Sequence, residues 1–574
     1  MNKKLWEAST SQKKKSLLSN YEQFISKKFN KKFNQKYESI LKWSIENPGN
    51  FWSSIWDFSE IKGFKSKIKI KKSKIFYKNK FLPNSKLNFA ENLLSKRDST
   101  EAIVFWGEDK YKTSLTYHEL YNQVAQLSYW LQSKGVVKGD RVAGFLPNMP
   151  ETVIALLAAS SIGAIWTSCS PDFGVQGVLD RFGQVEPKVF ICVDAYLYNG
   201  RIFNCLEKNQ SIISKLPTLE RTILVRYIDE KANNINLKQA TNFDEIVNNK
   251  ETKELIFERF KFNDPLYILF SSGTTGVPKC IVHGAGGTLI QHKKEHNLHC
   301  DIKEGERVFY FSTCGWMMWN WLISGLASGA TLMLYDGSPV LKNNESILFD
   351  YAEQEKFNVM GISAKFIDAC RKLDLNPMNS HNLSSMRMML STGSVLSSDC
   401  FDYVYEKIKN SVCLSSISGG TDIVSCFVLG NIYEPVIAGQ IQNKGLGMDV
   451  DIFNDHGKPI KNKKGELVCK NAFPTMPLKF WNDKNNIKFK EAYFKKFNNI
   501  WHHGDYAEIK KSGGFVIYGR SDTTLNPGGV RLGTSEIYSE VEKFKEIKES
   551  IVIGQSWDND IRIILFVIMN QNYQ

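Results

Sequence analysis

The sequence predicts an α/β protein in which layered, mostly parallel sheets are covered by helices. Short apolar runs typical of buried strands alternate with amphipathic stretches typical of helices, as expected for such layers. The 574 residues are 42% hydrophobic and 23% charged, which is ample for a sizeable core and excludes a disordered, collagen-like or coiled-coil chain. After residue 432 the pattern changes to short strands and turns, which predicts a small β-rich subdomain.

The individual elements follow from local patterns along the chain. Residues 1 to about 90 are polar and helix-biased, with tryptophans as aromatic anchors. A Pro/Asn turn at residues 147–150 precedes a helical pattern over 151–161. Apolar runs typical of strands occur at residues 102–106, 141–145, 188–193, 267–270, 331–335, 412–417, 449–453, 465–469 and 561–569.

Charge, cysteine content and hydropathy limit the partners. The net charge of +14 comes mainly from lysine spread along the chain, and the Lys/Ile alternation at residues 67–71 predicts a half-buried strand rather than a nucleic-acid surface. Eleven cysteines without a C-x-x-C pair indicate a reducing compartment. The N-terminus lacks the apolar segment of a signal peptide, and the apolar stretch at 153–166 is too short to cross a membrane. We expect a cytoplasmic protein that binds small molecules, with no nucleic-acid partner and no stable membrane insertion. The sequence leaves the oligomeric state open and is compatible with a monomer.

A segment rich in serine, threonine and glycine directly follows the expected strand at 267–270. Its hydroxyl groups and its backbone N–H groups suit an anion, the glycines allow close approach, and Lys279 adds a positive charge. A polyphosphate is the expected ligand, although an ordinary turn after a strand is the alternative. The spacing differs from that of a Walker A loop. The predicted anion-binding residues are Ser271, Ser272, Gly273, Thr274, Thr275, Gly276 and Lys279.

Two further loops carry polar residues after strand-like runs. In the first, Gly419 and Gly420 precede Thr421 and Asp422, a hydroxyl and a carboxylate that suit Mg²⁺ beside phosphate oxygens. In the second region, Asp505 and Arg520 follow short β-segments and could hold a ribose diol. A glycine-rich stretch ending in Arg531 comes next. Each of these motifs taken alone could be a surface turn.

In this order the loops resemble the adenylate-forming superfamily, which includes acyl-CoA synthetases, luciferases and peptide-synthetase adenylation domains, over residues 30–574. The resemblance implies an N-terminal extension over 1–95, an adenylation domain over 96–521, and a hinge with a partial C-terminal domain over 522–574. The branch of the superfamily that activates acetoacetate is similar at residues 170–182, 315–320, 335–339, 391–394, 419–423 and 519–531.

The resemblance implies that acetoacetate, ATP and CoA become acetoacetyl-CoA, AMP and pyrophosphate through an acyl-adenylate. Such sites act mainly by positioning and charge stabilisation. Thr274, Thr275 and Lys279 would hold the β- and γ-phosphates, Thr421 would contact the α-phosphate, and Asp422 would hold Mg²⁺. The resemblance also places Gly393 and Ser394 at the adenine, Asp505 and Arg520 at the ribose, Asp522 at a hinge, Gly529 in a pantetheine tunnel and Arg531 on a CoA phosphate.

The acid pocket can be argued from side-chain size. Acetyl-CoA synthetases carry a tryptophan where this chain has Gly419, so we expect room for a longer acid. Trp316, Met317 and Met318 would line the same pocket, although such residues are more often plain core. The sequence does not identify a donor for the keto oxygen.

Several alternatives stay open. The superfamily continues beyond the position of Gln574 through a segment whose lysine assists adenylation, so we expect a truncated chain, or a natural short form, with impaired adenylation. Other interpretations are an acyl-CoA synthetase for another short or medium-chain acid, a non-catalytic nucleotide-binding homologue, and a P-loop NTPase. Residues His292, Glu295 and His296 match an H-x-x-E-H zinc signature, for which an exposed polar helix is the simpler interpretation.

Overall fold

A computed structural model describes residues 3–229, 237–248, 254–271, 277–521, 524–530, 532–541 and 543–570. Within these residues, one large sheet is parallel as far as β15 and antiparallel over its last two strands. Its strands are almost continuously apolar because both faces are covered. In sheet order they are β13 (Ala240–Asn242), β12 (Arg221–Val225), β9 (Val189–Val193), β7 (Arg141–Phe145), β8 (Ile165–Cys169), β15 (Pro265–Ser271), β16 (Lys279–Gly284) and β28 (Lys479–Phe480).

A second large sheet is parallel except for its edge pair β5–β6. Together the two sheets confirm the predicted α/β class. The order of the second sheet is β21 (Cys413–Ser416), β20 (Met388–Thr392), β19 (Val359–Ser363), β17 (Arg307–Tyr310), β18 (Thr331–Asp336), β5 (Glu101–Gly107) and β6 (Tyr111–Thr116).

Helices cover both sheets, and two of them lie deep inside the molecule. Helix α7 (Pro150–Ser161) confirms the predicted helix and is buried at every position except Glu151. Helix α11 (Ala285–Lys294) is buried along its whole length, despite its polar C-terminal half. The other covering helices are α5 (Phe89–Leu93), α6 (Tyr117–Ser133), α8 (Val175–Val185), α9 (Leu206–Ser214), α10 (Phe243–Val247), α12 (Met317–Ile323), α13 (Ile347–Gln354), α14 (Ala364–Lys372), α15 (Pro377–Ser380) and α16 (Ser398–Tyr403).

The N-terminal segment is helical, as predicted, and its tryptophans are buried in the main core. The strand predicted at residues 67–71 is wrong over most of its length. Only β2 (Ile70–Lys71) forms, because its partner β3 (Lys80–Phe81) offers two residues for pairing. The N-terminal helices are α1 (Thr10–Lys14), α2 (Leu17–Phe29), α3 (Tyr37–Glu46) and α4 (Pro48–Phe58), and the short strands nearby are β1 (Lys4–Trp6) and β4 (Lys86–Leu87).

The β-rich part predicted after residue 432 is also present, with its own core around Phe427, Phe473 and Trp501. Its antiparallel sheet has the order β26 (Val450–Phe453), β27 (Gly465–Cys469), β29 (Trp501–Ile509) and β30 (Phe515–Arg520). Beside it lie β22 (Ser418–Gly420), β23 (Ser425–Leu429), β25 (Asn443–Lys444) and α17 (Ile487–Phe494). Minor strands are β10 (Ala195–Tyr198), β11 (Arg201–Asn204), β14 (Phe260–Lys261) and β24 (Val436–Ile437).

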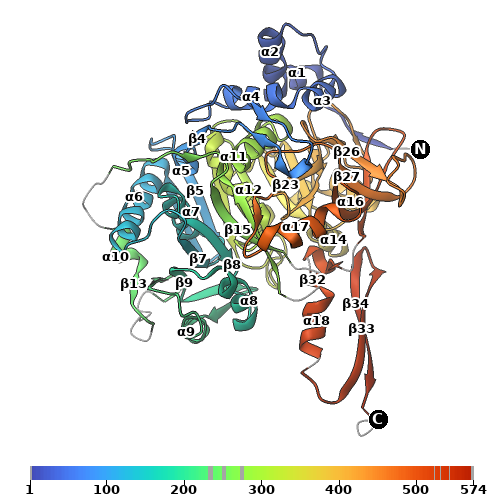
Figure 1. Cartoon of the computed structure of the whole chain (residues 1–574). Helices are drawn as coiled ribbons and strands as arrows, with labels where there is room; N and C mark the ends of the chain where they lie inside the picture. Colours follow the sequence, from blue (N-terminus) through green and yellow to red (C-terminus); the bar gives the residue numbers. More distant parts are fainter. Residues whose placement is uncertain are drawn as a thin grey trace.

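The C-terminal part projects from the body as a long hairpin beside a helix (Figure 1). At the turn of this hairpin, Lys365 of α14 lies 3.2 Å from an Asp560 carboxylate oxygen, and Lys372 bonds to Asp558. The elements are β31 (Thr524–Leu525), β32 (Leu532–Gly533), α18 (Thr534–Val541), β33 (Ile547–Trp557) and β34 (Asp560–Met569). We find no membrane-spanning helix among the described residues.

Candidate active site

A cavity of about 340 Å³ lies where the carboxyl ends of β19, β20 and β21 meet the β-rich part. Such strand ends are the usual position of ligand sites in open parallel sheets. The cavity gathers residues from segments far apart in the sequence, as predicted. The predicted site residues on its wall are Ser271, Trp316, Met317, Met318, Gly393, Ser394, Gly419, Gly420, Thr421, Asp505, Arg520 and Gly529.

Part of the predicted site cannot be placed. The residues concerned are Ser272, Gly273, Thr274, Thr275, Gly276, Asp522 and Arg531, which lie outside the described residues. The roles suggested for them stay predictions.

The anion-binding segment and the Thr421–Asp422 loop meet through an ion pair. Because β15 and β16 form a hairpin that pairs Ser271 with Lys279, this lysine lies at the base of the loop. Its Nζ donates to Asp422 Oδ1 over 2.9 Å, and the Tyr493 hydroxyl donates to the same oxygen over 2.6 Å. Asp422 is buried, so a positive charge beside it is required. The predicted phosphate lysine and the predicted magnesium carboxylate are therefore direct neighbours.

Two histidines without a predicted role, His283 and His503, support this region. His283 Nε2 lies 2.9 Å from the carbonyl oxygen of Thr421, and burial lowers the pKa of His283 to about 4. The neutral ring therefore donates and fixes the turn before Asp422. His503 Nε2 lies 3.2 Å from the carbonyl oxygen of Gly419, and burial lowers the pKa of His503 although Asp505 opposes this shift. Proximity along the chain gives no signal for either contact.

The predicted ribose residues face each other across two strands. Asp505 on β29 pairs with Arg520 on β30, and Arg520 Nη1 donates to Asp505 Oδ1 over 2.7 Å. Both side chains are on the cavity wall. A carboxylate held by a guanidinium keeps its orientation, which suits an acceptor for two hydroxyl groups of a ribose.

The structure corrects the size argument made for Gly419. A Cβ atom at this position would lie 1.9 Å from the Ser425 carbonyl oxygen and 2.7 Å from Cys426 Cα. Gly419 is therefore needed for the close approach of β22 and β23, and a side chain there would collide with a backbone before entering the cavity. Gly419 does line the cavity, but the cavity is not simply the space that a larger side chain at this position would fill.

The segment after β30 closes one side of the cavity. Asn526 Nδ2 donates to the Gly393 carbonyl oxygen over 2.7 Å. Gly529 has a left-handed φ of 83°, and a Cβ there would approach the Gly393 backbone to 3.0 Å. The predicted CoA residue thus touches the predicted adenine residue. A second cavity of about 560 Å³ adjoins the first and shares Phe311, Trp316, Ser363 and Gly528 with it.

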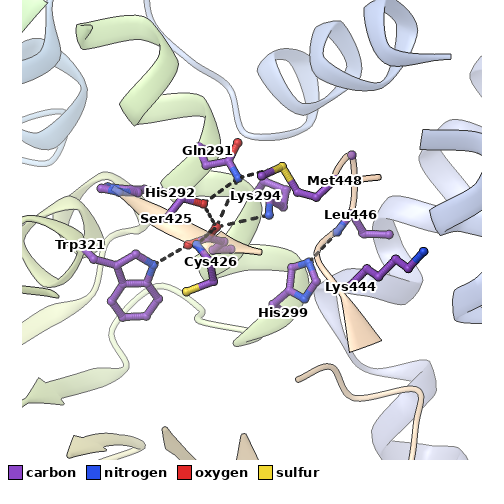
Figure 2. A network of polar contacts seen from close by, with 12 residues as sticks. Gln291, His292, Lys294, His299, Trp321, Ser425, Cys426, Lys444, Leu446 and Met448 are labelled. Carbon is purple, nitrogen blue, oxygen red and sulfur yellow. Dashed lines mark hydrogen bonds and ion pairs between the residues drawn. The ribbon is translucent and has the colours of Figure 1, made fainter. Parts of the chain in front are cut away.

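The H-x-x-E-H segment is not the exposed polar helix that we expected; it is fully buried at the end of α11 and in the π-helical turn Glu295–His299. His292 places its ring nitrogens 2.8 Å from Ser324 Oγ and 2.7 Å from the Val424 carbonyl oxygen, so both serve the protein itself. Figure 2 shows this polar network, to which Trp321 and Ser425 both belong through hydrogen bonds to Glu295. Among the described residues, no group of three or more His, Cys, Asp or Glu side chains could hold a metal.

The residues around Asp422, in contrast, do fit a magnesium ion carried by a nucleotide. Mg²⁺ is usually held by one or two carboxylates together with substrate phosphates rather than by a complete protein cage. Asp422 supplies one carboxylate beside the base of the anion-binding segment.

Comparisons with known proteins agree with this geometry. Residues 90–476 match the model of the AMP-binding enzyme family, and the chain belongs to that family. It is 52% identical to the acetoacetyl-coenzyme A synthetase of Rhizobium meliloti (strain 1021) and 44% identical to the acetoacetyl-CoA synthetase of Gallus gallus, over 92% and 94% of this chain and 81% and 82% of theirs. Its fold matches an acetoacetyl-CoA synthetase from Streptomyces lividans with a TM-score of 0.86 and 34% identity, over 99% of this chain and 87% of that one. Within the AMP-binding enzymes, the chain therefore belongs to the acetoacetyl-CoA synthetases.

Proposed function

We propose that the chain ligates acetoacetate to CoA at the expense of ATP, through an acetoacetyl-adenylate, and releases AMP and pyrophosphate. One observation carries the proposal. Residues from six separate segments of the chain, with chemistry suited to phosphate, adenine, ribose and an acid, line or adjoin a single cavity. The relatives named above support the choice of acid.

The residues would act by holding charge in place. Lys279 would stabilise the departing pyrophosphate, since this residue pairs with Ser271 at the base of the anion-binding segment and its amine lies beside Asp422. Thr421, held by His283, would contact the phosphate that the carboxylate attacks. Asp422 would hold Mg²⁺, which would neutralise phosphate charge when bound. Asp505 and Arg520 would fix the ribose, so that the attack occurs in one orientation.

The 3-oxo group of the acid needs a donor, and Tyr310 is the candidate. It lies on the cavity wall, it is buried, and its hydroxyl has no hydrogen-bond partner among the described residues. A buried hydroxyl left without a partner costs roughly 1–3 kcal/mol. A ligand oxygen that accepts from Tyr310 after a small movement of the wall would recover that energy.

The second cavity would serve the thiol substrate. It meets the first at Trp316 and Gly528, which gives a path to the adenylate for a long, thin chain such as pantetheine. Lys365 on its wall offers a positive charge to a phosphate group. All eleven cysteines are buried and reduced, which supports action in a reducing compartment such as the cytoplasm.

The test separates binding from chemistry. Isothermal titration would compare AMP with the non-hydrolysable mimics acetoacetyl-, acetyl- and butyryl-sulfamoyl-adenosine, and we expect the acetoacetyl compound to bind most tightly. The second half-reaction needs only preformed acetoacetyl-adenylate and CoA, and we expect acetoacetyl-CoA as the product. Tighter binding of another acyl group would indicate a synthetase for that acid. Nucleotide binding without any thioester formation would favour a non-catalytic homologue.

A further inference from the structure

The buried carboxylate of Glu295 lies behind the cavity and contacts no residue of the proposed reaction chemistry. Its side chain is 0% exposed, and five donors converge on it. They come from three elements, α11, α12 and β23, so the Glu295 carboxylate forms a joint between these elements. The donors are the Ser425 hydroxyl, the Cys426 backbone N–H, the Trp321 indole N–H, the Gln291 amide and the Lys294 amine.

One side of this joint is the strand that backs the acid and phosphate loop. The Ser425 hydroxyl donates to Glu295 Oε1, and the Cys426 N–H donates to the same oxygen over 3.3 Å. In the β22–β23 ladder, Cys426 pairs with Gly419 and Ser425 pairs with Gly420. Because Gly419 allows a very close approach, a shift of β23 must move β22 with it. Ser425 and Cys426 also line the cavity themselves.

The other side of the joint is helix α12, which also contributes residues to the cavity wall. Trp321 Nε1 donates to Glu295 Oε2 over 2.9 Å. Trp321 is on α12, which begins with the cavity residues Met317 and Met318. Its ring lies edge-on against the His296 ring with centroids 4.2 Å apart, so the indole has little room to turn.

We propose that Glu295 is a positioning residue that sets the width of the acid pocket by tying α12 to β23. This inference rests on the proposed function, because it assigns a role in acid selection. A carboxylate suits the position because all of its partners are donors, and Lys294, also 0% exposed, balances its charge at 3.3 Å. A hydrogen-bonded ionic group in such a position is rigid, which narrow selection of an acid requires.

The test exchanges the carboxylate for an amide of the same shape. In Glu295→Gln the new NH₂ group must face a donor, so either Trp321 or the β23 group loses its acceptor. We expect affinity for acetoacetyl-sulfamoyl-adenosine to fall about tenfold, the cost of losing one hydrogen bond to a charged group, whereas AMP affinity stays within about twofold. We also expect poorer discrimination against the bulkier hexanoyl mimic.

Two further variants make the result specific. Trp321→Phe removes the hydrogen-bond donor on the α12 side of the joint and should reproduce the loss of acyl selectivity. Glu108→Gln is the matched control, because Glu108 is also 0% exposed and bonded by the backbone N–H groups of Gly200 and Ser338, but it lies near the second cavity. It should leave acyl selectivity unchanged.

The outcomes separate the two proposals. If acyl and AMP affinity fall equally in both Glu295→Gln and Trp321→Phe, or if neither changes, Glu295 has no positioning role for the acid. If Glu108→Gln has the same effect as Glu295→Gln, the loss is general and the inference is overturned. If the unchanged chain binds the acetoacetyl mimic no better than AMP, the proposed function itself fails, whatever the variants do.

Discussion

Substitution of Gly419 by alanine is the sharpest test of how the site is built. The added Cβ would lie 1.9 Å from the Ser425 carbonyl oxygen, whereas real Cβ contacts under 3.0 Å essentially do not occur. The 1.1 Å difference must be met by moving a strand, since both colliding groups belong to backbone. Overpacking of this kind costs about 1–3 kcal/mol, and more when ladder hydrogen bonds break.

This energy should appear mainly as lost ligand affinity, because the loop moved by the strand carries Thr421 and Asp422. A cost of about 1–3 kcal/mol corresponds to about five- to 150-fold weaker binding of acetoacetyl-sulfamoyl-adenosine. Titration calorimetry measures this directly, and circular dichroism checks that the variant folds. We expect AMP to be weakened as well, in contrast to Glu295→Gln, because Thr421 lines the nucleotide cavity.

Gly420→Ala is the matched steric control. A Cβ at Gly420 would lie 3.6 Å from His503 Nε2, an ordinary contact, so its effect should be clearly milder. Equal affinities for the two variants would refute the reasoning that β22 and β23 are held together by close contact at Gly419. A Gly419→Trp variant that binds an acetyl mimic tightly would restore the simpler view that this position only sets pocket size.

The remaining predictions concern charge, the keto oxygen and pH. Lys279→Ala should weaken ATP binding at least about tenfold but leave AMP nearly unchanged, because the role proposed for Lys279 is to hold the phosphates that leave as pyrophosphate; equal weakening in calorimetry would contradict this role. Tyr310→Phe should lower the preference for the acetoacetyl mimic over the butyryl mimic about tenfold. An unchanged preference would show that Tyr310 is not the donor to the 3-oxo group. Burial lowers the pKa of His283 from 6.5 to about 4, so between these pH values the unfolded chain binds more protons than the folded chain. The stability that the neutral, buried His283 contributes is therefore complete above pH 6.5 and is lost as the pH falls towards 4. The total loss is about 3 kcal/mol. Urea unfolding at pH 7 and pH 4.5 measures this loss, and His283→Gln should have a smaller pH dependence than the unchanged chain.

Local sequence determined the alternation of strands and helices and the chemistry of each loop. The apolar run before Ser271 and the proline turn before α7 are local signals, because strands and helices depend on nearby periodicity. The hydroxyl and glycine content of the anion-binding segment likewise indicated a phosphate ligand without any structure. The side chains of Lys279, Asp505 and Arg520 were identified in the same way, and the structure places them at or beside one cavity.

Only the tertiary structure decided how the loops support one another. Tyr493 lies 71 residues from Asp422 in sequence, and Glu295 lies 130 residues from Ser425, so no local pattern reports these contacts. The polar H-x-x-E-H segment looked suited to solvent, but it is buried, and groups from other elements satisfy the polar atoms of His292 and Glu295. Gly419 shows the same limit. The sequence shows only that this position has no side chain, whereas the structure shows that the backbone of β23 lies where a side chain would be.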